Sequence, residues 1–269
     1  MGDRELEGRV CVVTGGGRGI GAAITEAFVD QGARVAILEA DPALAEEAER
    51  RFRESGADVR SYHTDVTDEE GVLQAAQAVE TELGPTDALV NNAGIGLLGA
   101  SMSFPVEDFR RSLEVMVTGV FLCSREFGKS MRDSGGGAIV NISSINGLVA
   151  FPMRLAYSAA KAAVISMTKI LAVEWAAYGI RVNAVAPGNT ETEMLKAAID
   201  QGLIDVDAYM AHTPLGRFAR PDEIADTVEY LASDRAGYLT GQVIVPDGGW
   251  TSFGWIPWTG DPDAPGIRQ

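Results

Sequence analysis

The stretch Val10-Cys-Val-Val-Thr-Gly-Gly-Gly-Arg-Gly-Ile-Gly21 decides the fold. A short apolar run enters a glycine-rich turn, and a helical pattern follows as far as Gly32. A strand, a glycine turn and a helix in this order are typical of a phosphate-binding loop. Glycines let the backbone approach phosphate groups, and the helix N-terminus presents free N–H groups. The spacing Gly15-x-x-x-Gly19-x-Gly21 differs from the common G-x-G-x-x-G pattern.

The alternation of strand and helix continues along the chain. Further strands are predicted at residues 34–38, 58–62, 87–90, 138–142, 180–185 and 242–245. This order predicts one α/β domain over residues 1–269, with a doubly wound, Rossmann-like parallel sheet of about seven strands and helices on both faces. Residues 189–213 carry only two short helical patches, so we expect a mobile lid there.

Charge and composition bound the function. The chain has 269 residues and a formal net charge of −16, which argues against nucleic acid as a partner. Its apolar runs are too short to span a bilayer, and its first residues lack a signal-peptide pattern. Cys11 and Cys123 lie in apolar contexts and indicate buried, reduced thiols. We therefore expect a cytoplasmic protein with no membrane partner, and we identify no metal site.

Glu39 follows the second predicted strand, about 20 residues after the glycine turn. A carboxylate there accepts hydrogen bonds from ribose hydroxyls and repels a 2′-phosphate, so the pattern favours NAD over NADP. Arg18 could attract a phosphate, but position 40 is Ala rather than Arg. Asp65 either caps the helix that begins near Asp68 or faces the adenine.

Asn91-Asn-Ala-Gly94 follows the fourth predicted strand and either lines a ligand crevice or forms a turn. Tyr157 and Lys161 lie one helical turn apart on one face of a predicted helix. A nearby ammonium favours the phenolate, which makes the tyrosine a usable base. Taken alone, the pair favours a helix with a lysine that extends to solvent.

These motifs occur in one order with Ser144, Pro187-Gly188, Pro214-Leu-Gly-Arg217 and Asp247-Gly-Gly249. From Glu7 to Gly249 the chain resembles the compact branch of the short-chain dehydrogenase/reductase family. The resemblance implies an NAD-dependent oxidoreductase that interconverts a secondary alcohol and a ketone. If the protein is an enzyme, the alternative to this function is an NADPH-preferring carbonyl reductase.

The resemblance also implies residue roles. Tyr157 would be the general acid/base, Lys161 would lower its pKa and bind the nicotinamide ribose, and Ser144 would orient the substrate oxygen. The residues implied for cofactor binding are Gly15, Arg18, Gly19, Ile20, Gly21, Glu39, Asp65, Val66, Asn92, Gly94, Tyr157, Lys161, Pro187, Gly188, Thr190 and Thr192.

Met116 departs from the family pattern, which has Asn three residues before the glycine that corresponds to Gly119. The family's Asn kinks the helix and holds a water that links the lysine to solvent, and a thioether accepts hydrogen bonds only weakly. Either other groups hold this water, or the protein binds cofactor with weak or no catalysis.

Substrate determinants are expected at residues 147–155, in the lid and near the C-terminus. Their side chains are mostly apolar, which favours a hydrophobic, possibly cyclic, alcohol or ketone, although the same side chains would suit a core or a subunit contact. Arg154 is the one charge that could bind a carboxylate. The Trp-rich tail, residues 250–269, is expected to dock on its own cleft or on another subunit of a tetramer or dimer.

Overall fold

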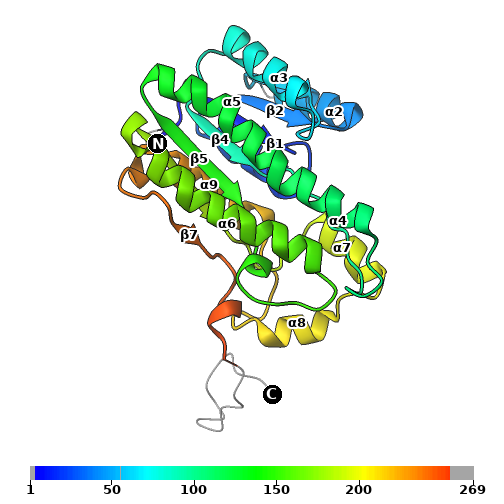
Figure 1. The fold of residues 1–269 in the computed structure, drawn as a ribbon. Helices are drawn as coiled ribbons and strands as arrows, with labels where there is room; N and C mark the ends of the chain where they lie inside the picture. The colour runs from blue at the N-terminus through cyan, green and yellow to red at the C-terminus, as the bar shows by residue number, and fades with distance from the viewer. Residues whose placement is uncertain (1–3, 55, 255–269) are drawn as a thin grey trace.

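Seven parallel strands form a single sheet in the computed structural model, which describes residues 4–54 and 56–254. Their order across the sheet is β3-β2-β1-β4-β5-β6-β7, so the chain runs outward from β1 in both directions (Figure 1). The predicted α/β fold is confirmed. The strands are β1 (Val10–Thr14), β2 (Arg34–Glu39), β3 (Val59–His63), β4 (Ala88–Asn91), β5 (Gly137–Ile142), β6 (Ile180–Val185) and β7 (Val243–Ile244).

Helices cover both faces of this sheet, and the central strands β1 and β4 are accordingly buried along their whole length. One core contains side chains of α1 (Gly19–Asp30), α2 (Pro42–Glu54) and α9 (Pro221–Ala232). The other contains side chains of α3 (Glu69–Glu82), α5 (Gly119–Ser134) and α6 (Leu155–Trp175). In Figure 1, α5 and α6 cross the near face of the sheet and α9 lies behind it.

The strand order reverses direction between β1 and β4, which are neighbours in the sheet although two strands, β2 and β3, lie between them in the chain. At such a switch point the loops after two adjacent strands diverge and leave a crevice at the carboxyl edge of the sheet. The glycine turn follows β1 and the Asn-Asn-Ala-Gly segment follows β4. The topology therefore brings these two predicted motifs together.

Apolar residues at helical spacing from Pro105 through Phe127 predict one long helix, but in the structure this helix is interrupted. The structure divides it into α4 (Val106–Leu113), a π-helical segment (Glu114–Thr118) and α5. The Gly119 N–H bonds the Glu114 carbonyl five residues back, so one extra residue widens the turn around Met116. Apolar periodicity predicts a helix but does not register one inserted residue, and the sequence pattern therefore missed the break.

Among the described residues, one helical stretch, Leu155–Tyr178, is long and apolar enough by composition alone to span a membrane. It comprises α6 and a short 3₁₀ segment (Ala176–Tyr178). One face of α6 packs on the sheet and carries the buried Lys161, as the core helix of a globular domain does. Its outer face exposes Ile170 and Val173.

Gly21→Ala tests the close approach that closes the glycine turn. A Cβ on Gly21 would lie 2.0 Å from the Gly15 carbonyl oxygen, so the backbone must move. We expect the free energy of unfolding to fall by about 1–3 kcal/mol, which is the usual cost of overpacking, and dinucleotide affinity to fall with it. Urea unfolding and NAD titration measure the two effects.

The matched control is Gly254→Ala, because a Cβ there meets no atom of residues 4–54 and 56–254 within 4 Å. Equal stability of the two variants would show that the turn tolerates displacement and does not depend on this contact.

Candidate active site

The glycine turn forms a cradle at the N-terminus of α1. Arg18 occupies the N-cap position, and its side chain makes no capping hydrogen bond, so the first N–H groups of the helix face the turn. Gly15 and Gly19 have φ values of 63° and 54°, a left-handed region that favours glycine. This cradle fits the pyrophosphate of a dinucleotide, because anions bind where free N–H groups meet the positive end of a helix dipole.

Thr14 ties the turn to the loop after β4. Its hydroxyl accepts hydrogen bonds from the N–H groups of Asn92 and Ala93, both at 3.0 Å. The Asn92 amide donates to the Thr14 carbonyl at 3.0 Å and to the Gly15 carbonyl at 2.9 Å. The Asn92 side chain, which the sequence placed along the cofactor, therefore holds the two crevice loops together.

The Glu39 carboxylate reaches across to the glycine turn. One oxygen accepts from the Gly17 N–H at 3.3 Å and the other accepts from the Ala40 N–H at 3.0 Å. These bonds fix a negative charge at the end of β2, beside the turn. The position suits the hydroxyl groups of an adenosine ribose, as the sequence pattern predicts.

Asp65 does not cap α3. Its carboxylate accepts from the N–H of Thr67 at 2.9 Å and from the Thr67 hydroxyl at 2.8 Å, which makes a local turn. Asp68 is the N-cap residue of α3. Val66 is buried against Gly119, where a Cβ would lie 2.7 Å from the Val66 side chain. Of the two roles predicted for Asp65, the capping role is wrong.

Ser144 lies just after β5 and is oriented by a neighbour that the sequence analysis missed. The backbone N–H and side-chain amide of Asn146 donate to the Ser144 Oγ at 3.1 Å and 3.2 Å. Because both lone pairs of the hydroxyl accept, its hydrogen is available to donate. The Asn146 Oδ1 atom is buried and has no partner among the described atoms.

Tyr157 is half-buried near the start of α6, close to this hydroxyl. Burial raises the pKa of Tyr157, while a hydrogen bond from Ser144 and the positive charge of Arg154 oppose the rise. The sequence pattern assigned the role of nearby cation to Lys161. In the structure the charge that opposes the rise is that of Arg154, three residues before Tyr157.

Lys161 lies one turn further along α6, with only 5% of its surface exposed. Its ammonium donates to the Ile142 carbonyl at 2.7 Å and lies 5.7 Å from the centre of the Tyr157 ring. Burial lowers the pKa of Lys161 to about 8, because little in the protein replaces the lost hydration of the charge. The structure thus brings Ser144, Tyr157 and Lys161 together from β5 and α6.

Met116 is fully buried in the π-helical segment, facing the loop after β4. Its sulfur lies 3.6 Å from the position that a Cβ on Gly94 would occupy. The helix is therefore widened at this position, although the residue that usually kinks it is absent. A π-helical turn displaces backbone carbonyls from the regular ladder and exposes acceptors that an α-helix would use internally.

The residues predicted to form a lid lie over the glycine turn. Thr192 is the N-cap of α7 (Glu193–Asp200), and its hydroxyl accepts from the Leu195 N–H at 3.3 Å. The side chains of Thr192 and Glu193 lie 3.5 Å from the position of a Cβ on Gly19. The two predicted helical patches are confirmed as α7 and α8 (Val206–His212).

Pro187 and Gly188 connect β6 to this lid. The Pro187 carbonyl accepts from the Ile145 N–H at 3.1 Å, which places it beside the Ser144 loop. Thr190 donates its hydroxyl hydrogen to the Gly188 carbonyl at 3.1 Å and pairs with Ala219. The predicted cofactor residues of this segment thus border the same carboxyl edge as the catalytic candidates.

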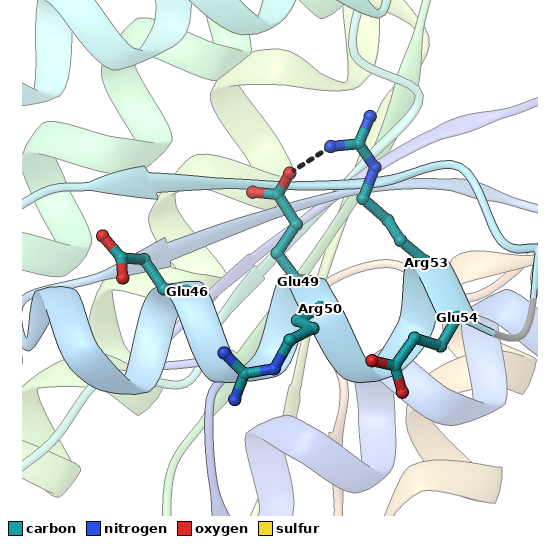
Figure 2. A pocket seen from close by; sticks show the side chains of 5 residues that line it. All are labelled: Glu46, Glu49, Arg50, Arg53 and Glu54. Carbon is teal, nitrogen blue, oxygen red and sulfur yellow. Dashed lines mark hydrogen bonds and ion pairs between the residues drawn. The ribbon is translucent and has the colours of Figure 1, made fainter.

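Two hollows lie apart from the side chains of Ser144, Tyr157 and Lys161. One, of about 180 Å³, lies between Gly188 and residues 246–248. The other, of about 560 Å³, lies on the outer face of α2, where Figure 2 shows Glu49 reaching toward Arg53, with Glu46, Arg50 and Glu54. The Glu49–Arg53 ion pair spans 2.8 Å, and all five side chains are charged. None of them belongs to the predicted site.

The tail prediction is confirmed only at its beginning. Trp250 lies in a short 3₁₀ segment (Trp250–Ser252), and its ring stacks on Phe151 with a 5.7 Å separation of centres. It also contacts Tyr209 of α8 at 5.2 Å. This part of the tail docks on its own lid. Residues 255–269, with the other two tail tryptophans, lie outside the described residues.

The fold and this arrangement define a dinucleotide-binding α/β protein with a Ser-Tyr-Lys constellation at the carboxyl edge. A family model described as Enoyl-(Acyl carrier protein) reductase matches residues 15–251. The chain is 41% identical over 254 residues to a D-threitol dehydrogenase of Mycolicibacterium smegmatis, a match that covers 93% of this chain and 95% of the relative.

Two further comparisons agree. The chain is 42% identical over 255 residues to a cis-4-hydroxycyclohexanecarboxylate dehydrogenase of Sinomonas cyclohexanicum, covering 94% of this chain and all of the relative. A gluconate 5-dehydrogenase from Burkholderia cenocepacia, solved with NADP and tartrate, superposes with a TM-score of 0.88 at 34% identity, covering 93% and 98% of the two chains. The chain belongs to the short-chain dehydrogenase/reductase family and is an oxidoreductase that uses a nicotinamide dinucleotide.

Lys161→Met tests the cost of the buried ammonium. In the native protein the pKa of Lys161 lies at about 8 rather than 10.5, so its folded form loses its proton first. Stability that the charge costs at pH 7 is regained as pH rises from about 8 to 10.5. We expect the native protein to gain about 2 kcal/mol over Lys161→Met between pH 7 and 10.

Urea unfolding at several pH values measures this difference. A difference between the two proteins that stays constant across this interval would show that the ammonium is not destabilised by burial.

Proposed function

We propose that this protein is an NAD-dependent dehydrogenase that interconverts a secondary alcohol and a ketone. The observation that carries the proposal is the convergence of Ser144, Tyr157 and Lys161 beside a dinucleotide cradle that ends at Glu39. The relatives support the same reaction type, since those reported above are named for alcohol substrates.

The bound nicotinamide would supply the hydride acceptor or donor. The protein's own residues would move and place the proton. In oxidation Tyr157, as phenolate, takes the proton of the substrate hydroxyl, while Ser144 donates a hydrogen bond to the same oxygen. Asn146 holds Ser144 in the donating orientation. Lys161 adds a positive charge within 5.7 Å of the phenol ring, which favours the phenolate, and binds the nicotinamide ribose.

NAD is proposed over NADP because of Glu39. Its carboxylate is fixed by two backbone N–H groups and repels a 2′-phosphate at that position. Arg18, at the start of α1, is the one feature that favours NADP, and the similar gluconate 5-dehydrogenase was solved with NADP. Arg18, Ile20, Asp65, Val66 and Gly94 complete the proposed dinucleotide contacts.

A proton route past Met116 is proposed through the backbone. The π-helical segment releases acceptors beside Gly94, and Lys161 already donates to a backbone carbonyl, that of Ile142. A water held by such carbonyls would connect Lys161 to solvent without an asparagine side chain. The rival proposal, a cofactor-binding protein with little catalysis, rests on the thioether at this position.

We propose that each chain is a single domain. Two or four such chains would associate through the outer faces of α5 and α6 to form a dimer or a tetramer. Val173 is 80% exposed, Ile170 54% and Phe121 45%, and apolar side chains gathered in this way favour a protein contact.

Both cysteines are free and buried, and burial raises the pKa of Cys123 to about 12, which fits inert thiols in the cytoplasm.

Tyr157→Phe tests the enzymatic proposal. We expect the native protein to reduce NAD with at least one member of a panel of cyclic and linear secondary alcohols, followed by NADH absorbance. The variant should retain NAD affinity and lose at least 10³-fold in turnover, because only the proton acceptor is removed.

The Met116→Asn variant distinguishes the dehydrogenase from the rival proposal, a cofactor-binding protein with little catalysis. High native turnover that does not rise in the variant supports a backbone-held route. An inactive native protein beside an active Met116→Asn protein would contradict the proposal that the native chain is a dehydrogenase.

Glu39→Ala tests the cofactor preference. Removal of the carboxylate should raise the NADP-to-NAD ratio of kcat/KM by at least tenfold, because repulsion of the 2′-phosphate disappears. Asp41→Ala is the matched control: it removes an equal charge two residues away, where the carboxylate bonds the Ala43 N–H instead of the glycine turn. A native preference for NADP, or an equal change of the NADP-to-NAD ratio in both variants, would contradict the proposal that Glu39 makes the enzyme prefer NAD.

A further inference from the structure

Three aromatic rings from distant parts of the chain form a wall beside Arg154. Phe151 precedes α6, Tyr209 belongs to α8 and Trp250 begins the tail. The ring centres lie 6.5 Å apart for Phe151–Tyr209, 5.7 Å for Phe151–Trp250 and 5.2 Å for Tyr209–Trp250. Figure 1 shows α8 below the N-terminal end of α6, close to the segment that carries Trp250. This wall presents flat apolar surface near the proposed reacting centre.

Arg154 is the charged member of this surface. It is the N-cap residue of α6, and its guanidinium lies 5.5 Å from the centre of the Phe151 ring. Its Nη2 atom donates to the Tyr209 hydroxyl at 3.1 Å. Within the part of the chain that the structure describes, one of its five N–H donors is used, which leaves a fork of donors for a planar anion.

Arg154 has no carboxylate partner among residues 4–54 and 56–254, although the chain has 38 acidic and 22 basic residues. Other partly covered arginines in this region do have one: Arg9 pairs with Asp234, Arg34 with Asp58 and Arg125 with Glu126. A half-buried guanidinium is stabilised by an anion. Arg181 is also half-buried without a carboxylate partner, but its guanidinium donates to the carbonyls of Leu231 and Ser233. Arg154 donates only to the Tyr209 hydroxyl among the described residues, so an anion supplied from outside would complete its hydrogen bonds.

Arg154 is also close enough to act on the reacting group. Its charge opposes the rise that burial causes in the pKa of Tyr157, and it lies one helical turn before Tyr157. An anionic group bound at Arg154 would therefore place a carbon a few ångströms away at the phenol. The surface negative charge of the protein repels anionic molecules, and a local cation is the means by which such a substrate would bind.

We propose that Arg154 binds a carboxylate of the substrate, so that the substrates are hydroxy acids whose apolar ring or chain packs against Phe151, Tyr209 and Trp250. This inference rests on the proposed dehydrogenase function and narrows its substrate class. Arg154 sets specificity: it would orient the molecule so that the carbinol carbon, and not the carboxylate, meets Tyr157.

The test compares 4-hydroxycyclohexanecarboxylate with its uncharged methyl amide, which has a similar shape. We expect native kcat/KM to favour the acid by at least tenfold. Arg154→Gln should reduce the acid-to-amide ratio at least tenfold, mainly through KM for the acid, and Arg154→Lys should give an intermediate ratio because it keeps charge and loses the fork.

Arg235→Gln is the matched control, since it removes an equal charge from the short segment Asp234–Ala236 after α9, away from the wall. Its acid-to-amide ratio should remain within about twofold of native. A native preference for the amide, or an equal fall of both substrates in Arg154→Gln, would overturn the inference while leaving the dehydrogenase function intact.

A second readout does not depend on turnover. Binding of the unreactive cyclohexanecarboxylate to the native protein, measured by calorimetry with NAD present, should weaken at least tenfold in Arg154→Gln. If neither alcohol is oxidised, the proposed dehydrogenase function fails on these substrates, and calorimetry alone tests whether Arg154 binds a carboxylate. If the native protein then binds no cyclohexanecarboxylate, the proposal that Arg154 binds a carboxylate is refuted.

Discussion

The hydroxyl of Thr14 is the interaction on which the site depends. It accepts from two successive N–H groups after β4, and Asn92 returns two hydrogen bonds to the end of β1. Without this tie, the loops that diverge at the switch point would carry unpaired backbone groups at the edge of the sheet. Because the tie fixes the start of α1 relative to β4, it also fixes the cradle relative to the neighbouring β5, where the Ser144 loop begins.

The side chains of Tyr157 and Lys161 carry the proposed chemistry in their charged forms, yet burial disfavours those forms. Tyr157 and Lys161 would each be more stable uncharged where they lie, since burial raises one pKa and lowers the other. The protein offsets this cost with directed contacts: a hydrogen bond from Ser144, the charge of Arg154 and the carbonyl of Ile142. The contacts with Ser144 and Arg154 oppose the rise in the pKa of Tyr157 and so favour the phenolate that general base catalysis requires, whereas burial itself brings the pKa of Lys161 down to about 8.

The sheet, the placement of both crevice loops and the Tyr157–Lys161 spacing were predictable from the residues, because glycines, apolar strand runs and helical spacing act locally. The inclusion of Ser144 came from the family resemblance. The π-helical turn at Met116 was not, since one inserted residue leaves the apolar pattern unchanged. The Asn146 contact depends on a 3₁₀ turn after Ser144. The Arg154–Tyr209 bond joins residues 55 positions apart and required the fold itself.

The aromatic wall draws one residue from each of three segments: the loop before α6, the lid and the start of the tail. None of the three rings belongs to the sheet that holds the cradle and the reacting groups. Substitutions at each segment can therefore accumulate separately during evolution, reshaping one wall at a time while the chemistry stays in place. In this architecture new substrate ranges arise by exchanging loops and tails, and the inherited scaffold need not be rebuilt.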